Sequence, residues 1–475
     1  MKYETVIGLE VHLQLNTKTK AFCSCAVKFG QQPNSAVCPV CLGFPGTLPV
    51  FNKEVLNSAI KVALALNCQI QEHTKFDRKN YFYPDLPKDY QISQFDLPIS
   101  KNGYLDITVG KENKRVGITR VHMEEDAGKL IHQEGLSLVD FNRTGVPLLE
   151  IVSEPDLRSP QEAFEYLTML KGVIEYLDVS DCDMEKGSLR CDANISLRLT
   201  GAKGLGVKTE LKNMNSFKGV KDALTFEVQR QTEILESGEK IFQETRLWDT
   251  DKGETFTMRT KEGAKDYRYF SDPDLTDFLI EQKTIQHIKE SLPELPQAKI
   301  KRLVEEYRIS EYEAKILSAS RATADFAEEC FRIYQGKEFK SVVNWLIGPL
   351  LSEANARGLS VSGLEITPQK IIELIGFVER QEISNLSAKV VLADLLDSKR
   401  SVIEIIKEKN LIQISDSASL EKIIDQVLLT NAKSVADFKS GKANALMFLV
   451  GQVMKKSQGK ANPKLLQEMI KGRLS

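Results

Sequence analysis

The chain has 475 residues, of which 42% are hydrophobic and 27% are charged, and its formal net charge is −2. This length excludes a single ordinary core, so we expect a soluble globular protein of two to four domains. The near-neutral total charge gives no indication of nucleic-acid binding.

The N-terminus has no basic segment followed by an apolar run, so no signal peptide is expected. The longest apolar runs, such as residues 445–450, are far too short to span a membrane. Eight cysteines without a secretory signal favour a reducing compartment and a metal role over disulfides. We therefore expect a cytoplasmic protein with no membrane partner.

The first predicted element is a strand over residues 8–15, in which Leu9, Val11 and Leu13 alternate with Glu10 and His12. A carboxylate and an imidazole side by side are unusual on a strand face. They indicate either part of an active site or, on their own, an ordinary solvated sheet surface.

A cysteine motif follows this strand directly. Its pattern is CxC, twelve residues and CPVC, and its members are Cys23, Cys25, Cys38 and Cys41. Two short cysteine pairs across a loop can supply four thiolates to one tetrahedral zinc ion. The alternative is a set of buried or redox-active thiols.

Further along the chain, strands and helices mix. Helices are predicted over residues 52–66 and 160–177, the second beginning at Ser159-Pro160. Strands are predicted over residues 117–125, 147–152, 189–199 and 207–211. No βαβ repeat or dinucleotide-binding glycine motif is present, so the pattern predicts an α+β fold with a large, mainly antiparallel sheet.

Near residues 291–296 the composition changes, and helical periodicity dominates afterwards. Ser310 to Glu313 reads as a capping box, and Thr367-Pro368 as a helix start. We expect a sheet domain over residues 1–292, an all-helical domain over 293–405 and a small helical tail domain over 406–475. Residues 430–475 carry nine basic and two acidic side chains.

The polar faces of the predicted strands share one chemistry. Besides Glu10 and His12, they carry His122 and Glu124, Glu150, Arg190 and Asp192, and Lys208 and Glu210. Carboxylates hold Mg²⁺, and cations neutralise a phosphoryl group in transfer. Five strands with this asymmetry favour phosphoryl transfer over a solvated surface. The chain has no evident nucleophile of its own for amide hydrolysis.

Several segments together resemble the B-subunit family of the bacterial aspartyl/glutamyl-tRNA amidotransferases, and the resemblance covers the whole chain. Besides the cysteine pairs, they are GLEVHLQL (8–15), CLGFPGTLPV (41–50), RKNYFYPDLPKDYQISQ (78–94), VHMEEDAGKL (121–130), DFNRTGVPLLEIVSEPD (140–156), KTELKNMNSF (208–217) and DYRYFSDPDL (266–275). The segment at 140–156 is long enough to be nearly family-specific.

The resemblance implies a first domain that forms a cradle related to glutamine synthetase and guanido kinases. It implies ATP- and Mg²⁺-dependent phosphorylation of the side-chain carboxylate of Glu or Asp misacylated onto tRNA-Gln or tRNA-Asn, followed by amidation with ammonia. An amidase subunit would supply the ammonia through a channel, and a small third subunit would complete a heterotrimer. The helical region and the tail would hold the tRNA.

On this basis we assign expected roles to individual residues. The Mg²⁺ ligands are His12, Glu125 and Glu150, with Glu10 as a further candidate, and His12 is the least preferred by chemistry. Arg190 and Lys208 are phosphate partners, and Asp192 and Glu210 serve metal or nucleotide. Lys79 and Lys88 contact phosphate or the end of the ammonia path. The cysteines hold a structural zinc, and tRNA phosphates contact Lys455, Lys456, Lys460 and Lys464.

Two other functions remain open. The chain could be a non-catalytic tRNA-binding scaffold whose partner performs the chemistry, or a zinc-dependent nucleic-acid-binding protein.

Overall fold

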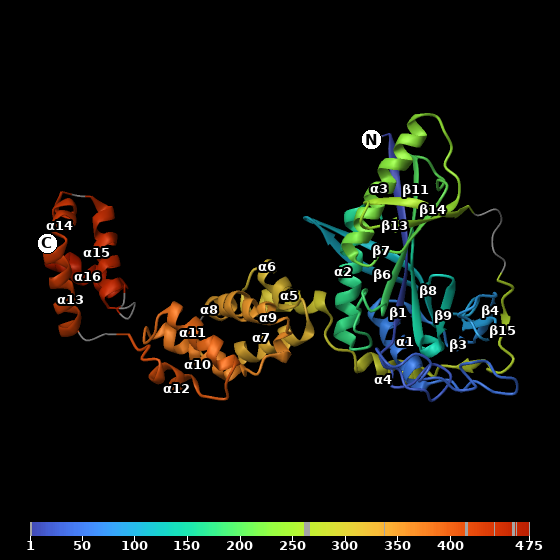
Figure 1. The fold of residues 1–475 in the computed structure, drawn as a ribbon, viewed down its shortest axis with the longest axis horizontal. Coiled ribbons are helices and arrows are strands. Elements are labelled where there is room, and N and C mark those ends of the chain that lie inside the picture. The colour runs from blue at the N-terminus through green and yellow to red at the C-terminus, as the bar shows by residue number, and fades with distance from the viewer. Residues whose placement is uncertain are drawn as a thin grey trace. The chain divides into compact units, whose positions relative to one another are not determined.

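The computed structural model describes residues 2–260, 267–336, 338–413, 417–440, 442–457, 461 and 463–474. The chain divides into two compact units, Met1–Leu295 and Pro296–Ser475. The first is built around one large sheet, and the second is helical (Figure 1).

The sheet of the first unit has nine strands in the order β14-β13-β12-β11-β1-β10-β7-β6-β2. Strands β12 and β13 are parallel, and the other neighbouring pairs are antiparallel. The strands are β1 (Tyr3–Gln14), β2 (Gln69–Ile70), β6 (Ser100–Val109), β7 (Glu112–Glu125), β10 (Pro147–Ser153), β11 (Leu189–Leu199), β12 (Thr209–Lys212), β13 (Glu244–Asp249) and β14 (Glu254–Thr260). Strand β1 therefore lies at the centre, although it is first in the chain.

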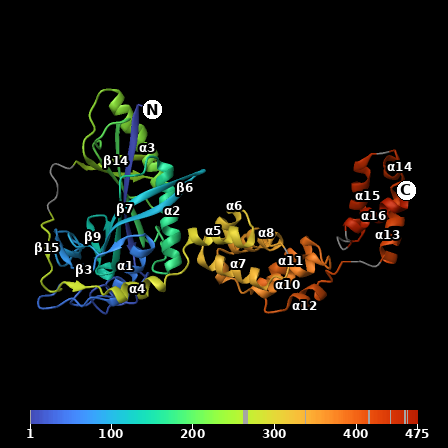
Figure 2. The same cartoon turned by 180° about the vertical axis from the view of Figure 1, so that it is seen from behind.

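Helices cover one face of this sheet, as both views of the fold show (Figures 1 and 2). They are α1 (Lys53–Ala65), α2 (Pro160–Leu177) and α3 (Phe217–Glu236), and α4 (Gln282–Glu290) packs beside α1. The alternate residues Leu9, Val11 and Leu13 of β1 are buried with the helices in one hydrophobic core. The side chains between them necessarily point to the opposite face, which carries the polar residues.

Short sheets complete the first unit. A three-stranded sheet has the order β15-β4-β5 and contains β4 (Asp77–Asn80), β5 (Tyr90–Ser93) and β15 (Phe270–Ser271). Two further sheets have two strands each: β3 (His73–Thr74) pairs with β16 (Phe278–Leu279), and β8 (Lys129–Gln133) pairs with β9 (Leu136–Asp140). A 3₁₀ turn, η1 (Phe141–Arg143), connects β9 to the segment before β10.

The second unit contains two separate hydrophobic cores. The first core is formed by α5 (Pro296–Tyr307), α6 (Glu311–Leu317), α7 (Arg321–Ile333), α8 (Lys340–Trp345), the π-helix η2 (Leu346–Leu350), α9 (Leu351–Arg357), the 3₁₀ turn η3 (Val361–Gly363), α10 (Pro368–Glu379), α11 (Asn385–Leu396) and α12 (Val402–Glu408). The second is formed by α13 (Ser417–Thr430), α14 (Ala432–Lys439), α15 (Ala443–Lys456) and α16 (Pro463–Leu474).

The local signals in the sequence predicted these elements well. Ser159 caps α2 by accepting from the Glu162 N–H, with Pro160 at the first helical position. The capping box at Ser310 is confirmed, as is the Thr367 cap. The mixed α+β class with a mainly antiparallel sheet and a helical C-terminal region is confirmed. Among the described residues, no helix is long and apolar enough to cross a membrane.

Candidate functional site

The centre of the polar sheet face carries a row of three ionisable side chains. In register, His12 of β1 pairs with Glu150 of β10, and Glu150 pairs with His122 of β7. Directly opposed residues on neighbouring strands point to the same face, so the three side chains lie side by side. Glu124 lies two residues beyond His122 in β7 and therefore projects to the same face.

These side chains come close enough to share a cation. His12 Nε2 lies 3.5 Å from Glu150 Oε2 and 3.8 Å from Glu124 Oε1. One possible ligand atom each from His12, Glu124 and Glu150 lies within 4.8 Å of the others. His122 Nε2 is 3.4 Å from Glu150 Oε2. Two carboxylates and one imidazole fit a divalent cation that retains open positions for substrate oxygens.

The charges in this group stabilise one another. Burial alone would raise the pKa of Glu150, but His122 and His12 hold it well below its usual value. Burial opposes the charged form of His12, yet Glu150 and Glu124 raise its pKa. Lys79 of β4 belongs to the same electrostatic group, because Glu124 raises its pKa despite the opposing effect of burial.

Glu125 does not join this group. Its carboxylate forms a salt bridge with Lys88 and accepts the Ile92 N–H at 2.9 Å. The predicted ligand set therefore differs from the observed grouping, which contains Glu124 in place of Glu125. The reason is local: Glu125 ends β7, where the strand faces β5 and Lys88.

Glu10 also lies outside the grouping of His12, Glu124 and Glu150. It accepts a hydrogen bond of 2.8 Å from Asn194 Nδ2, and both line a cavity of about 420 Å³. Residues from β1, β10 and β11 line this cavity, together with the loop that contains Leu205 and Lys208. Asn194 Oδ1 is buried and has no partner among the described protein atoms. A buried acceptor without a partner is uncommon in folded proteins and unfavourable in free energy.

The other predicted cofactor residues lie on β11 and β12 or beside them. Arg190 lies opposite His12 in register and donates to Asp126 at 3.0 Å, while its buried Nε has no partner among the described atoms. Asp192 forms a salt bridge with Lys212, and Glu210 lies 3.1 Å from the same ammonium. Lys208 is exposed and precedes β12.

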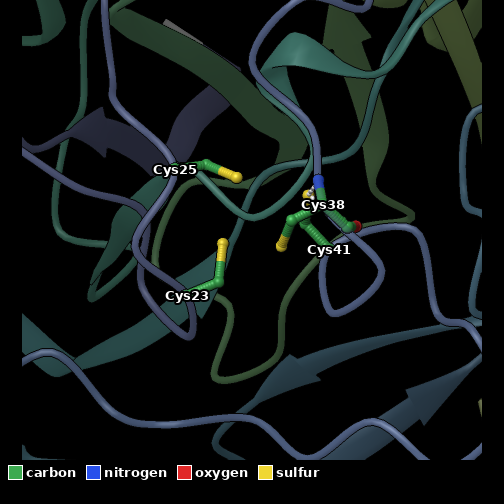
Figure 3. A group of neighbouring side chains, drawn as sticks. All are labelled: Cys23, Cys25, Cys38 and Cys41. Carbon is green, nitrogen blue, oxygen red and sulfur yellow. Dashed lines mark hydrogen bonds between the residues drawn. The ribbon is translucent and has the colours of Figure 1, made fainter.

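The four motif cysteines converge as the spacing predicts. One sulfur from each of Cys23, Cys25, Cys38 and Cys41 lies within 4.8 Å of the others, and the side chains face a common point (Figure 3). This arrangement fits a tetrahedral zinc ion. Cys23 and Cys41 also line a cavity of about 90 Å³ together with Lys88 and Glu125. The cluster and the Lys88–Glu125 pair are therefore neighbours.

The predicted tRNA-binding lysines lie in the last core of the second unit. Lys455 and Lys456 are exposed in the final turn of α15. Lys460 lies outside the described residues, and Lys464 lies in α16, where its side chain is not described.

Sequence reasoning did not assign roles to Glu124, His122 or Lys212. The alternation in β7 carried the signal for the first two, because it separates His122 and Glu124 from Val121 and Met123, which are buried in the core. For Lys212 the predicted strand ended one residue too early, at residue 211, whereas β12 ends at Lys212.

The whole chain resembles proteins of one family. Residues 5–286 match the family model described as GatB/GatE catalytic domain, and residues 325–474 match that described as GatB domain. The chain is 53% identical to the B subunit of the aspartyl/glutamyl-tRNA(Asn/Gln) amidotransferase of Carboxydothermus hydrogenoformans, over 100% of this chain and 99% of that protein. It is 51% identical to the protein of the same name from Moorella thermoacetica over 100% of both chains. The identity to that from Brevibacillus brevis is 52% over 99% of both chains.

Proposed function

This chain belongs to the family of aspartyl/glutamyl-tRNA(Asn/Gln) amidotransferase B subunits, and on that premise we propose the step that it performs. It uses ATP to phosphorylate the side-chain carboxylate of Glu-tRNA(Gln) or Asp-tRNA(Asn), and ammonia then displaces the phosphate to form the amide. Activation is necessary because ammonia does not displace the oxygen of a free carboxylate. The chain is thus a subunit of an amidotransferase complex, and the complex performs ligase chemistry.

The row of His12, Glu150 and His122 with Glu124 is the observation that carries this proposal. His12, Glu124 and Glu150 would hold Mg²⁺, which when bound neutralises phosphate oxygens during transfer. Lys79 supplies a positive charge beside these carboxylates, and Arg190 offers a buried N–H without a partner to an anionic group.

We assign the ATP nucleoside to the cavity beside Glu10 and Asn194. Its volume of about 420 Å³ is within the range of small-molecule sites. Val6, Leu205 and Val207 give it apolar walls suited to a base, while Asn194 Oδ1 offers an acceptor. The triphosphate would then run along the polar face toward His12, with Lys208 and Lys212 beside its path.

We propose the remaining parts on the resemblance to this family. An amidase subunit supplies the ammonia, whose path ends at the cavity beside Lys88 and Glu125, and a small third subunit completes a cytoplasmic heterotrimer. Residues 1–292 form a cradle of the glutamine synthetase and guanido kinase type. Residues 293–405 and the basic tail domain, 406–475, bind tRNA, and the four cysteines hold a structural zinc.

The test is amidation by the reconstituted complex with each misacylated tRNA, with and without ATP. Glu150→Gln should abolish ATP hydrolysis that depends on misacylated tRNA, while Glu112→Gln, an exposed change in β7, should leave it intact. A non-catalytic scaffold predicts the opposite, namely that the complex with Glu150→Gln remains fully active. A zinc-dependent nucleic-acid-binding protein predicts loss of tRNA binding when Cys38 and Cys41 are replaced by serine.

A further inference from the structure

Lys20 is the fully buried lysine at the base of the loop that carries Cys23 and Cys25. Its side chain has 0% exposure. The backbone N–H of Lys20 donates to Cys25 O at 2.9 Å, and a bridge between Thr19 and Ala26 closes the loop. These backbone contacts therefore fix the position of Lys20 beside the cysteines.

The contacts of its ammonium group are unusual for a buried lysine. Nζ lies 3.5 Å from Cys41 Sγ and 3.3 Å from Phe141 O. Across the described part of the chain, no carboxylate forms an ion pair with Lys20. A buried ammonium without an anionic partner is strongly unfavourable. The sulfur of Cys41 also accepts the Cys38 N–H at 3.2 Å, so two donors converge on one sulfur.

We propose that Lys20 is the counter-ion of a zinc-loaded cysteine cluster. Four thiolates around one Zn²⁺ carry a formal charge of about −2, and a buried ammonium in contact with one sulfur reduces it to about −1. The four sulfurs then supply the anion that Lys20 otherwise lacks. This inference rests on the proposed zinc site and is independent of the proposed amidation.

The position of Lys20 also relates the cluster to Glu125. A Cβ atom added at Gly145 would lie 3.5 Å from Lys20 Cδ, 3.6 Å from Cys41 Cβ and 3.7 Å from Glu125 Oε2. The cluster and the Glu125 carboxylate are therefore separated by little more than this glycine. Lys20 acts as a positioning residue that limits like-charge repulsion between them, which is weakly screened in a buried site.

The test compares Lys20→Met, Lys20→Arg and the control Lys18→Met in the full-length chain. Lys18 is an exposed lysine two residues away. Zinc per chain is measured by mass spectrometry, and zinc release is followed with a chromophoric chelator. We expect one zinc per wild-type chain. Zinc release from Lys20→Met should be faster by about tenfold or more, equivalent to a free-energy difference of about 1.4 kcal/mol. Lys20→Arg and Lys18→Met should release zinc near the wild-type rate.

Wild-type protein without zinc after expression in zinc-supplemented medium would overturn the proposal. Equal release rates for wild type and Lys20→Met would overturn it as well, as would faster release from Lys18→Met alone.

If Lys20→Met does not fold, a second comparison tests the counter-ion role of Lys20. Replacing all four cysteines by serine removes the anionic partner and leaves the Lys20 ammonium buried alone. Adding Lys20→Met to this chain should raise its Tm and soluble yield, whereas the same change in wild type lowers them. If Lys20 serves only to fill space, the change lowers Tm and yield in both backgrounds, and that result overturns the proposal.

Discussion

Glu124 and Glu125 are consecutive residues of β7, and their carboxylates have different partners. Glu124 Oε1 lies 3.8 Å from His12 Nε2, whereas Glu125 forms a salt bridge with Lys88 and accepts the Ile92 N–H. The alternation of a strand sends neighbouring side chains to opposite faces. One residue step thus separates the group that could bind a cation from the pair beside the cysteine cluster.

This separation predicts different defects for two similar variants. Glu124→Gln removes one charged oxygen from the proposed Mg²⁺ site, so the Mg²⁺ concentration that gives half-maximal amidation should rise by about tenfold or more. Glu125→Gln should reduce amidation but leave this Mg²⁺ concentration unchanged. Titration of Mg²⁺ in the reconstituted complex measures both values. A shift with Glu125→Gln and none with Glu124→Gln would return the ligand role to Glu125.

His122 should orient Glu150 in the group of His12, Glu124 and Glu150 without being essential for cation binding by that group. Its Nδ1 accepts from Arg120 at 3.3 Å, while its Nε2 faces Glu150 at 3.4 Å. His122→Asn should raise the Mg²⁺ requirement by roughly tenfold, as for other residues that hold metal ligands in place. Maximal rate at saturating Mg²⁺ should stay within about threefold of wild type. An unchanged Mg²⁺ requirement would mean that Glu150 is fixed by other contacts.

The buried carboxylate of Glu227 in α3 should make the stability of the first unit depend on pH. Burial alone would raise its pKa, but hydrogen bonds from Arg230 and Thr255 hold it below the usual value. A lowered pKa means that the ionised group stabilises the fold above the unfolded pKa of about 4.3. This contribution is lost as the pH falls through the folded pKa.

Glu227→Gln should therefore cost about 3 kcal/mol of unfolding free energy at pH 7 and less at pH 3.5. Urea unfolding followed by Trp248 fluorescence in a Trp345→Phe background measures the first unit, because Trp248 is buried in its core. Glu233→Gln on the exposed side of α3 provides the control. An equal cost at both pH values would contradict the role given to the charge.

The tail lysines should affect tRNA binding and leave the chemistry intact. Changing Lys455 and Lys456 to glutamate should raise the KM for tRNA by about tenfold and reduce its salt dependence, because phosphate contacts release counter-ions. The value of kcat should change less than about twofold. Lys240→Glu, an exposed change in the first unit, is the control. A fall in kcat at constant KM would exclude the tail from tRNA capture.

Strand periodicity predicted much of the site, because two-residue alternation fixes which side chains share a face. The pattern brought His12, Glu150 and Arg190 to one surface, and the register of the strands joins them there. The same alternation placed Glu124, and not Glu125, on the face of His122, but the expected ligand set followed the family resemblance and named Glu125. The alternation did not indicate the burial of Lys20, because the contacts of its ammonium group are with Cys41 and the Phe141 carbonyl, which come from distant parts of the sequence.

The central position of β1 has a consequence for synthesis. Both strands that flank it come from far downstream, β10 beginning at Pro147 and β11 at Leu189. The first strand to leave the ribosome therefore has unpaired backbone edges and an exposed apolar face until its neighbours emerge. Such non-local pairing slows folding and prolongs exposure to aggregation, so the first unit should depend on chaperones during translation more than the helical second unit does.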